Sequence, residues 1–359
     1  FSETGSYTGV EDGSDKLYII NQVAGEDKKK TFKTTNGQKI GTLYVAGNVD
    51  LVLNGAVSVT KFETNAGDTN FIAHDFTVNI GGTGSLSTMS TTSMDFTRAS
   101  STSGVIGTYN LNVPVTCSGE IKTHSGSVLN INSDTQTNTL VHSANDAKHQ
   151  TFINVNNNSI LTVDGKIDLA ENENSGASLS VESGATVKAK SIIDKSTFAN
   201  GEGQIPLTNN GTIEVSESID LTTISNSGTI TTPTINTSSI TNSGTITATN
   251  AFTATNYLRP TDSTSDVVDI KEGATLSITN DATISTLTFV KTNDNLDDFA
   301  KLEENLSVTN ATYNTADIQT SGNITLPKTT VTTNEIGNLL IGSGNLTIEN
   351  LHGANLTNA

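Results

Sequence analysis

One segment of the chain carries oxygen-bearing side chains at a spacing that suits a hard cation. Asn293, Asn295, Asp297 and Glu304 take the first, third, fifth and twelfth positions of an EF-hand loop, which binds calcium. The sixth position holds Asp298 instead of glycine, and the first holds Asn instead of Asp. An ordinary capped helix is therefore the preferred interpretation. Calcium at these four residues is the alternative, and the sequence suggests no other cofactor.

Carboxylates that could act in catalysis are scattered. Glycoside cleavage needs acidic groups that converge on one face, and only Asp164 and Asp168 are placed to project together. Aspartates of this kind are more often turn formers. The acidic cluster Asp262, Asp266 and Asp269 is equally consistent with plain surface. We therefore expect no catalytic residue and predict that the protein is not an enzyme.

Histidines are also poorly placed for chemistry, because none of them shows the tight spacing of metal ligands. They are His74, His124, His142, His149 and His352. Eight asparagines stand in Asn-x-Ser/Thr triplets, but a chain this rich in the three residues produces such triplets by chance.

The elements that position these residues are indicated by one phrase that occurs three times. Its copies are Asn209-Asn210-Gly211-Thr212-Ile213, Asn226-Ser227-Gly228-Thr229-Ile230 and Asn242-Ser243-Gly244-Thr245-Ile246. Asn-Ser-Gly predicts a corner, since glycine can adopt positive φ and asparagine can bond its own backbone. We predict Asn226, Gly228, Asn242 and Gly244 as structural corners, with the asparagines bonded to one another in a ladder along the stack.

Each copy of the phrase is followed by large apolar residues at nearly fixed offsets. These anchors are Ile213, Ile219 and Ile224, then Ile230, Ile235 and Ile240, then Ile246, Phe252 and Tyr257 or Leu258. A repeat this short cannot bury its anchors alone, so they form a core only when successive repeats stack. Alternating apolar and polar residues rich in Thr and Ile favour strands. The sequence therefore predicts an all-β fold, a β-solenoid.

Composition limits the partners and fits a solenoid. Only 33% of residues are hydrophobic and Trp is absent, which a narrow column of aliphatic side chains tolerates. The net charge of −18 excludes a nucleic-acid-binding surface and disfavours an anionic membrane surface. Cys117 is alone, so no intramolecular disulfide can form.

Two domains are expected along the chain. Residues 1–40 are predicted to be N-terminal capping strands, and residues 41–359 a parallel β-helix with a short helical excursion near 295–305. The Ser/Thr-rich segment from Ser85 to Ser103 is predicted to be an irregular protruding loop or an imperfect coil.

Three stretches carry a resemblance to a known family. Gly165-Lys166-Ile167-Asp168-Leu169, the run from Ala177 to Val187 and the Asn-Ser-Gly-Thr-Ile repeats resemble passenger domains of bacterial autotransporters and related β-helical surface adhesins. The resemblance covers about Ile40 to Ile348, and it is one of style rather than of an invariant motif. It implies a single-stranded, right-handed parallel β-helix that is secreted or displayed on the surface of a Gram-negative bacterium.

The function that follows from this resemblance is non-enzymatic adhesion to a protein or glycan ligand on host cells or neighbouring bacteria, with self-association as a further expectation. Two alternatives remain, a structural subunit of a surface layer and a carbohydrate-active β-helix enzyme. Thr-x-Thr pairs such as Thr232/Thr234, Thr245/Thr247 and Thr253/Thr255 predict a flat hydroxyl array on stacked strands. Such an array also suits ice, which makes an ice-binding solenoid a minor alternative.

Overall fold

The computed structural model describes the backbone and side chains of residues 14–21, 28–64, 74–96, 106–143, 151–170, 176–194, 205–260 and 266–271. For strand β1 (Thr4–Ser6) and the strands after Lys271 it describes the backbone, together with the buried side chains of Leu276 and Ile284. Every regular element in this part of the chain is a β-strand. The chain divides into two units, Phe1–Pro206 and Leu207–Ala359.

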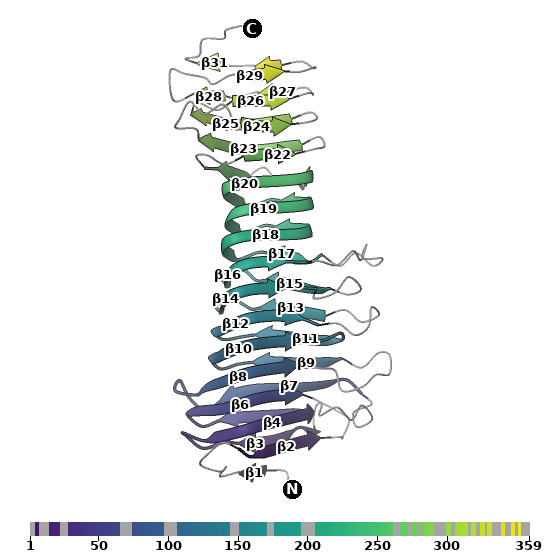
Figure 1. The fold of residues 1–359 in the computed structure, drawn as a ribbon, viewed down its shortest axis with the longest axis vertical. Coiled ribbons are helices and arrows are strands. Elements are labelled where there is room, and N and C mark those ends of the chain that lie inside the picture. Colours follow the sequence, from purple (N-terminus) through teal and green to yellow (C-terminus); the bar gives the residue numbers. More distant parts are fainter. Residues whose placement is uncertain are drawn as a thin grey trace. The chain divides into compact units, whose positions relative to one another are not determined.

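The first unit consists of two stacks of parallel strands, one even-numbered and one odd-numbered (Figure 1). The even-numbered strands are β2 (Lys16–Asn21), β4 (Lys39–Gly47), β6 (Ala56–Thr64), β8 (Thr88–Phe96), β10 (Val115–Thr123), β12 (Thr135–His142), β14 (Ile160–Asp168) and β16 (Thr186–Ile193). The odd-numbered strands after β1 are β3 (Lys30–Lys33), β5 (Val49–Leu53), β7 (Phe76–Gly82), β9 (Gly107–Leu111), β11 (Ser127–Ile131), β13 (Thr151–Val155) and β15 (Ala177–Val181). Each strand pairs with the strand two places further on, so one even and one odd strand complete a coil.

The core of the first unit is a set of apolar columns that run from coil to coil. Alternate residues of each strand point inward, because successive side chains of a strand lie on opposite faces. One column, in register throughout and at most 1% exposed, is Leu43, Phe62, Met94, Ile121, Leu140, Ile167 and Ile192. Burying each such side chain contributes about 1.5–3 kcal/mol.

The longer even-numbered strands bend where their register shifts by a residue, as between Cys117 and Glu120 of β10. Gly119 lies at this bend, and a Cβ atom there would come within 2.4 Å of the Thr92 carbonyl oxygen. Two threonines near the bends, Thr91 and Thr137, point inward and donate hydrogen bonds to backbone carbonyls. The bend therefore divides each long strand into two limbs, and the odd strand supplies the third limb of the coil.

The second unit begins with β17 (Leu207–Asn209) and three long strands that each follow most of a coil, β18 (Thr212–Asn226), β19 (Thr229–Asn242) and β20 (Thr245–Leu258). Three inward columns join the long strands in register. They are Ile213, Ile230 and Ile246; Ile219, Ile235 and Phe252; and Ile224, Ile240 and Tyr257. All nine side chains are at most 1% exposed, whereas Leu258 is 52% exposed. The predicted anchors are confirmed, with Tyr257 and not Leu258 in the core.

Parallel pairing continues to the end of the described backbone. The remaining strands are β21 (Val267–Ile270), β22 (Thr275–Ile278), β23 (Ala282–Val290), β24 (Phe299–Leu302), β25 (Leu306–Asn314), β26 (Asp317–Thr320), β27 (Ile324–Leu326), β28 (Thr329–Val331), β29 (Leu339–Ile341), β30 (Leu346–Ile348) and β31 (Leu351–His352). Strands of this region again pair in parallel with a strand of the coil before them. The expectation of an all-β parallel β-helix is confirmed.

Two local predictions within this fold are tested by the structure, and the first of them is wrong. A helical excursion is predicted near 295–305, but Phe299–Leu302 forms strand β24 and pairs in parallel with β22 and β26; the other residues of that segment lie outside the described part of the chain. Hydrogen bonds between coils override the weak local preference for helix. For Ser85 to Ser103 the structure favours the predicted imperfect coil over the protruding loop, because Thr88–Phe96 is strand β8, and its Met94 and Phe96 are buried.

The described strands within residues 1–40, predicted as N-terminal capping strands, pair with the strands that follow them. Within residues 1–40, β2 pairs in register with β4, and β3 pairs in register with β5. Leu17, Ile19 and Phe32 point into the core. Strands β2 and β3 therefore continue the coils of the helix in register.

Candidate functional site

The predicted calcium ligands Asn293, Asn295, Asp297 and Glu304 lie outside the described residues. Among the residues that are described, no group of three or more His, Cys, Asp and Glu side chains could hold a metal ion. In the same part of the chain, no helix is long and apolar enough to cross a membrane.

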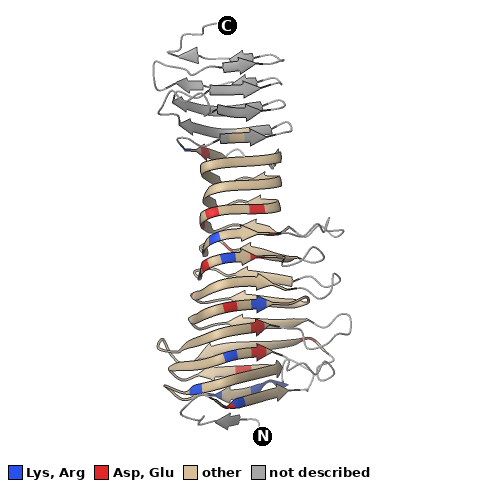
Figure 2. Ribbon diagram, viewed as in Figure 1, with Lys and Arg blue, Asp and Glu red and all other residues tan. Residues whose placement is uncertain are grey.

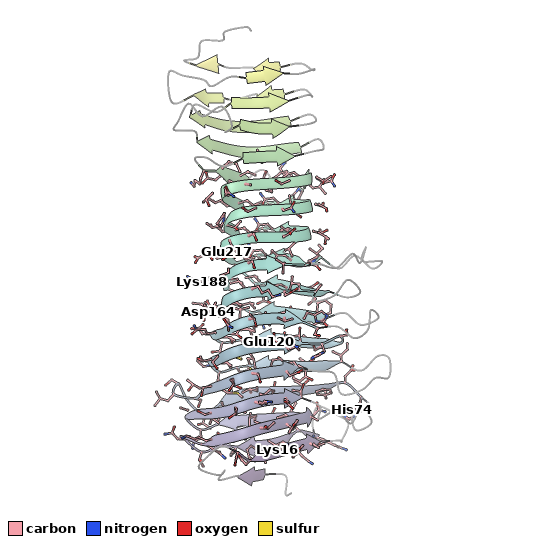
Figure 3. All side chains as sticks on the ribbon, in the orientation of Figure 1. Lys16, His74, Glu120, Asp164, Lys188 and Glu217 are labelled. Atoms are coloured by element: carbon pink, nitrogen blue, oxygen red, sulfur yellow. The ribbon has the colours of Figure 1, made fainter. Side chains whose placement is uncertain are left out.

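The acidic side chains considered for catalysis have different environments. Asp164, labelled in Figure 3, is exposed and accepts a hydrogen bond from Gln136 at 3.2 Å. Asp168 is only 2% exposed in its side chain, and it pairs with Lys166 at 2.7 Å. In the other acidic cluster, Asp266 is buried while Asp269 pairs with Lys271 at 2.6 Å near the surface. Asp262 lies outside the described residues, and the described members of each set differ in exposure and partners instead of forming a pair of carboxylates on one face.

The predicted corner asparagines form a buried ladder in the second unit. Asn209 Nδ2 donates to Asn226 Oδ1 at 2.7 Å, and Asn226 Nδ2 donates to Asn242 Oδ1 at 2.7 Å. All three are at most 2% exposed. A buried amide must have its donors and acceptors satisfied, and this ladder does so for successive coils at once.

The ladder ends on an acidic group. Asn242 Nδ2 donates to Tyr257 Oη at 3.0 Å, and Tyr257 Oη donates to the Asp266 carboxylate at 2.8 Å. Burial raises the pKa of the Tyr257 hydroxyl well above its ordinary value, and the charge of Asp266 raises it further. An ionised carboxylate only accepts hydrogen bonds, so Asp266 fixes the direction in which the hydroxyl and the amides of the ladder point.

The corner glycines Gly228 and Gly244 are required for a reason that differs from the prediction. Neither has positive φ, unlike Gly37 and Gly55. A Cβ atom on Gly228 would lie 2.1 Å from the carbonyl oxygen of Gly211, and a Cβ atom on Gly244 would lie 2.1 Å from that of Gly228. Close stacking of backbone on backbone is what excludes a side chain at these corners.

An outer face of the first unit carries two rows of asparagine side chains, which we call the amide face. Its first row is Asn79, Asn110, Asn130 and Asn154, and its second row is Asn112, Asn132 and Asn156. They project from, or directly follow, strands β7, β9, β11 and β13, and each is half-buried or exposed. Residues two apart on a strand point to the same side, so the two rows lie next to each other.

Hydrogen bonds hold the first row in one direction. Asn154 donates to Asn130 and Asn130 to Asn110, each at 2.8 Å, and Asn110 donates to Asn79 at 2.7 Å. Asn79 then donates to the carboxylate of Asp50 at 2.6 Å. The second row is bonded in the same direction, from Asn156 to Asn132 and from Asn132 to Asn112. The amides of this face are therefore fixed in orientation.

The amide face is uncharged along most of its length. Strands β7, β9, β11, β13 and β15 contain no Lys, Arg, Asp or Glu, and most of the described ribbon in Figure 2 is tan, the colour of residues other than these four. Phe152 of β13 is 36% exposed on this side, in register with Val128 and Ser178. The face thus combines oriented neutral amides with one exposed aromatic ring.

A second outer surface, in the second unit, presents threonine hydroxyls in register. Thr229 lies opposite Thr245, and Thr231 lies opposite Thr247. The predicted pair Thr232/Thr234 does not belong to this array, because Thr232 is buried and donates to the Thr234 carbonyl at 3.2 Å. Two acidic residues flank the array, because Glu214 lies opposite Thr231 and Asp269 lies opposite Thr247.

The buried ladder should contribute strongly to stability. We expect Asn226→Ala to lower the free energy of unfolding by about 2 kcal/mol, because it leaves buried amide groups of Asn209 and Asn242 without their ladder partner. Asn236→Ala in the same unit is the matched control, since Asn236 is exposed and its bond to Asp220 can be replaced by water. Urea unfolding followed by circular dichroism measures both. Equal midpoints for the two variants would contradict the prediction.

The amide face was not predicted, although the sequence carries its signal. Asn110-Leu111-Asn112, Asn130-Ile131-Asn132 and Asn154-Val155-Asn156 repeat one triplet, an apolar residue between two asparagines. The central residue is buried in each case. The triplet therefore places two amides outward on every coil in which it occurs.

Comparison of the chain with protein-family models, with curated proteins and with solved structures gave no match.

Proposed function

We propose that this protein is a non-enzymatic bacterial surface adhesin, of the autotransporter-passenger type, that attaches to ligands on host cells or neighbouring bacteria. The observation that carries the proposal is the amide face, in which seven oriented asparagines from successive coils form one continuous polar surface.

A surface of this kind suits attachment for two physical reasons. Side chains already fixed by ladder bonds lose little conformational freedom when a ligand binds, so less of the contact energy is spent on ordering. Repetition from coil to coil also lets a ligand with its own repeat make many weak contacts at once, which raises the overall affinity by multivalency. The net charge of −18 keeps such a surface soluble and disfavours non-specific association with anionic membranes.

Attachment of the purified chain to cells is the direct test. We expect beads coated with the chain to bind epithelial cells or bacteria saturably, and soluble chain to compete for that binding. Failure to bind either kind of cell would contradict the proposal. Ordered sheets formed with divalent cations would replace it with a surface-layer role, and depolymerisation of a polysaccharide would replace it with an enzyme.

A further inference from the structure

On the basis of the proposed adhesive function, we propose that the amide face is a binding site for a neutral polysaccharide, which lies along the stack of coils with its sugar units across the two asparagine rows. Four properties of the amide face favour this ligand: the hydrogen-bonding groups that its rows leave unused, the exposed ring of Phe152, the local charge and the repeat spacing.

The hydrogen bonds along the rows of the amide face use only part of each amide. An asparagine side chain has two N–H donors and a carbonyl oxygen with two lone pairs. In the first row, Asn110 and Asn130 each use one donor and one acceptor in the ladder bonds that join the row. Each amide therefore keeps a further donor and a further acceptor for a ligand, and the amides of the row share one orientation. Sugar hydroxyls both donate and accept, so they match such a surface.

Phe152 supplies the apolar contact that sugar rings also need. It lies two residues before Asn154 on the same side of β13, and Val128 is opposite it on β11. Its exposed fraction of 36% exceeds what core packing would leave, since Ile153 beside it is fully buried. The face of an aromatic ring carries partial negative charge and attracts polarised C–H groups, such as those on one side of a pyranose.

Charge selects a neutral ligand. The five odd-numbered strands β7 to β15 contain no basic residue that could pair with a sulfate or carboxylate. The charged residues that do adjoin the rows are acidic, with Asp50 at the start of the first row and Glu182 beyond the second. These carboxylates would repel an anionic glycan.

Spacing explains why a polymer is expected instead of a single sugar. Neighbouring parallel strands are about 4.8 Å apart, which is comparable to the length that one pyranose adds to an extended chain. A polysaccharide can therefore place successive sugars over successive coils, whereas a monosaccharide would contact only one or two asparagines.

Binding of the full chain to defined sugars tests the inference. The probes are immobilised cello-, malto- and manno-hexasaccharides, with heparin as the anionic comparison. We expect at least one neutral hexasaccharide to bind more tightly than its monosaccharide and more tightly than heparin. Phe152→Ser and Asn130→Thr should each weaken that binding about tenfold or more, as removal of a central contact does. Thermal melting shows whether each variant retains the fold.

Asn138→Thr is the matched control, because Asn138 is exposed on β12, outside the amide face, and its loss should leave binding unchanged. Phe152→Ser keeps the test decisive if Asn130→Thr fails to fold, since the Phe152 side chain lies outside the core. Absence of binding to every neutral hexasaccharide, preference for heparin, or unchanged binding in folded Phe152→Ser would overturn the inference. If cell attachment persists while hexasaccharides fail to bind, only the glycan inference is lost; if hexasaccharides bind while attachment fails, only adhesion is lost.

Discussion

Ile230→Asp should abolish stable folding of the second unit. Ile230 is fully buried and stands in register between Ile213 and Ile246, so the substitution places a carboxylate inside an aliphatic column. An isolated charge there cannot be paired, and it must either be desolvated or force the coils apart. We expect the free energy of unfolding to fall by about 4–5 kcal/mol or more, which is among the largest effects of a single substitution. Circular dichroism and urea unfolding would report it.

Thr229→Asp is the control for this change, because Thr229 precedes Ile230 and points outward. The same charge at that position should alter the stability by only a few tenths of a kcal/mol. A parent-like unfolding midpoint for Ile230→Asp would mean that Ile230 does not lie in the core. An equal loss in both variants would show that charge anywhere in the strand, and not burial, is responsible.

The architecture could be predicted from the repeat because stacking imposes one rule on every coil. Ile213, Ile230 and Ile246 occur at nearly constant spacing because each packs against its equivalent in the next coil. The buried asparagines Asn226 and Asn242 follow the same rule, since a polar residue inside the stack is satisfied by an identical neighbour. Register therefore converts sequence periodicity into structure directly.

Predictions failed where local composition was interpreted without that register. The segment of β8 is rich in Ser and Thr, but its inward positions are Met89, Thr91, Met94 and Phe96. The buried Thr91 donates hydrogen bonds to backbone carbonyls at the bend. Threonine can thus fill an interior position that a hydrophobicity pattern scores as surface. The helical spacing near Phe299 was misleading for a related reason, because pairing with adjacent coils determines the conformation of its backbone.

The candidate site was missed because its residues are ordinary one at a time. An asparagine on a strand predicts nothing by itself, and β-propensity disfavours it. Only the pairing of Asn110 with Asn130, and of Asn130 with Asn154, shows that these amides form a row. The repeated triplet indicates this arrangement once its three copies are aligned by coil.

Gly228→Ala should destabilise the second unit even though alanine is usually a better strand and helix residue than glycine. The added Cβ would lie 2.1 Å from the Gly211 carbonyl oxygen and 2.8 Å from the Asn210 carbonyl carbon, and both are backbone atoms that cannot rotate away. The corner at Gly228 must therefore move away from the corner at Gly211 in the preceding coil. This movement also stretches the hydrogen bond from Asn209 to Asn226 in the buried ladder. We expect the free energy of unfolding, measured in urea, to fall by about 3 kcal/mol or more, at the upper end of overpacking effects.

Gly81→Ala is the control, because a Cβ there meets nothing within 4 Å and the φ of Gly81 is not positive. That change should raise stability by about 0.4–1 kcal/mol through a smaller entropy of the unfolded chain. If Gly228→Ala were as stable as the parent, close backbone stacking at the corners would not be what requires glycine.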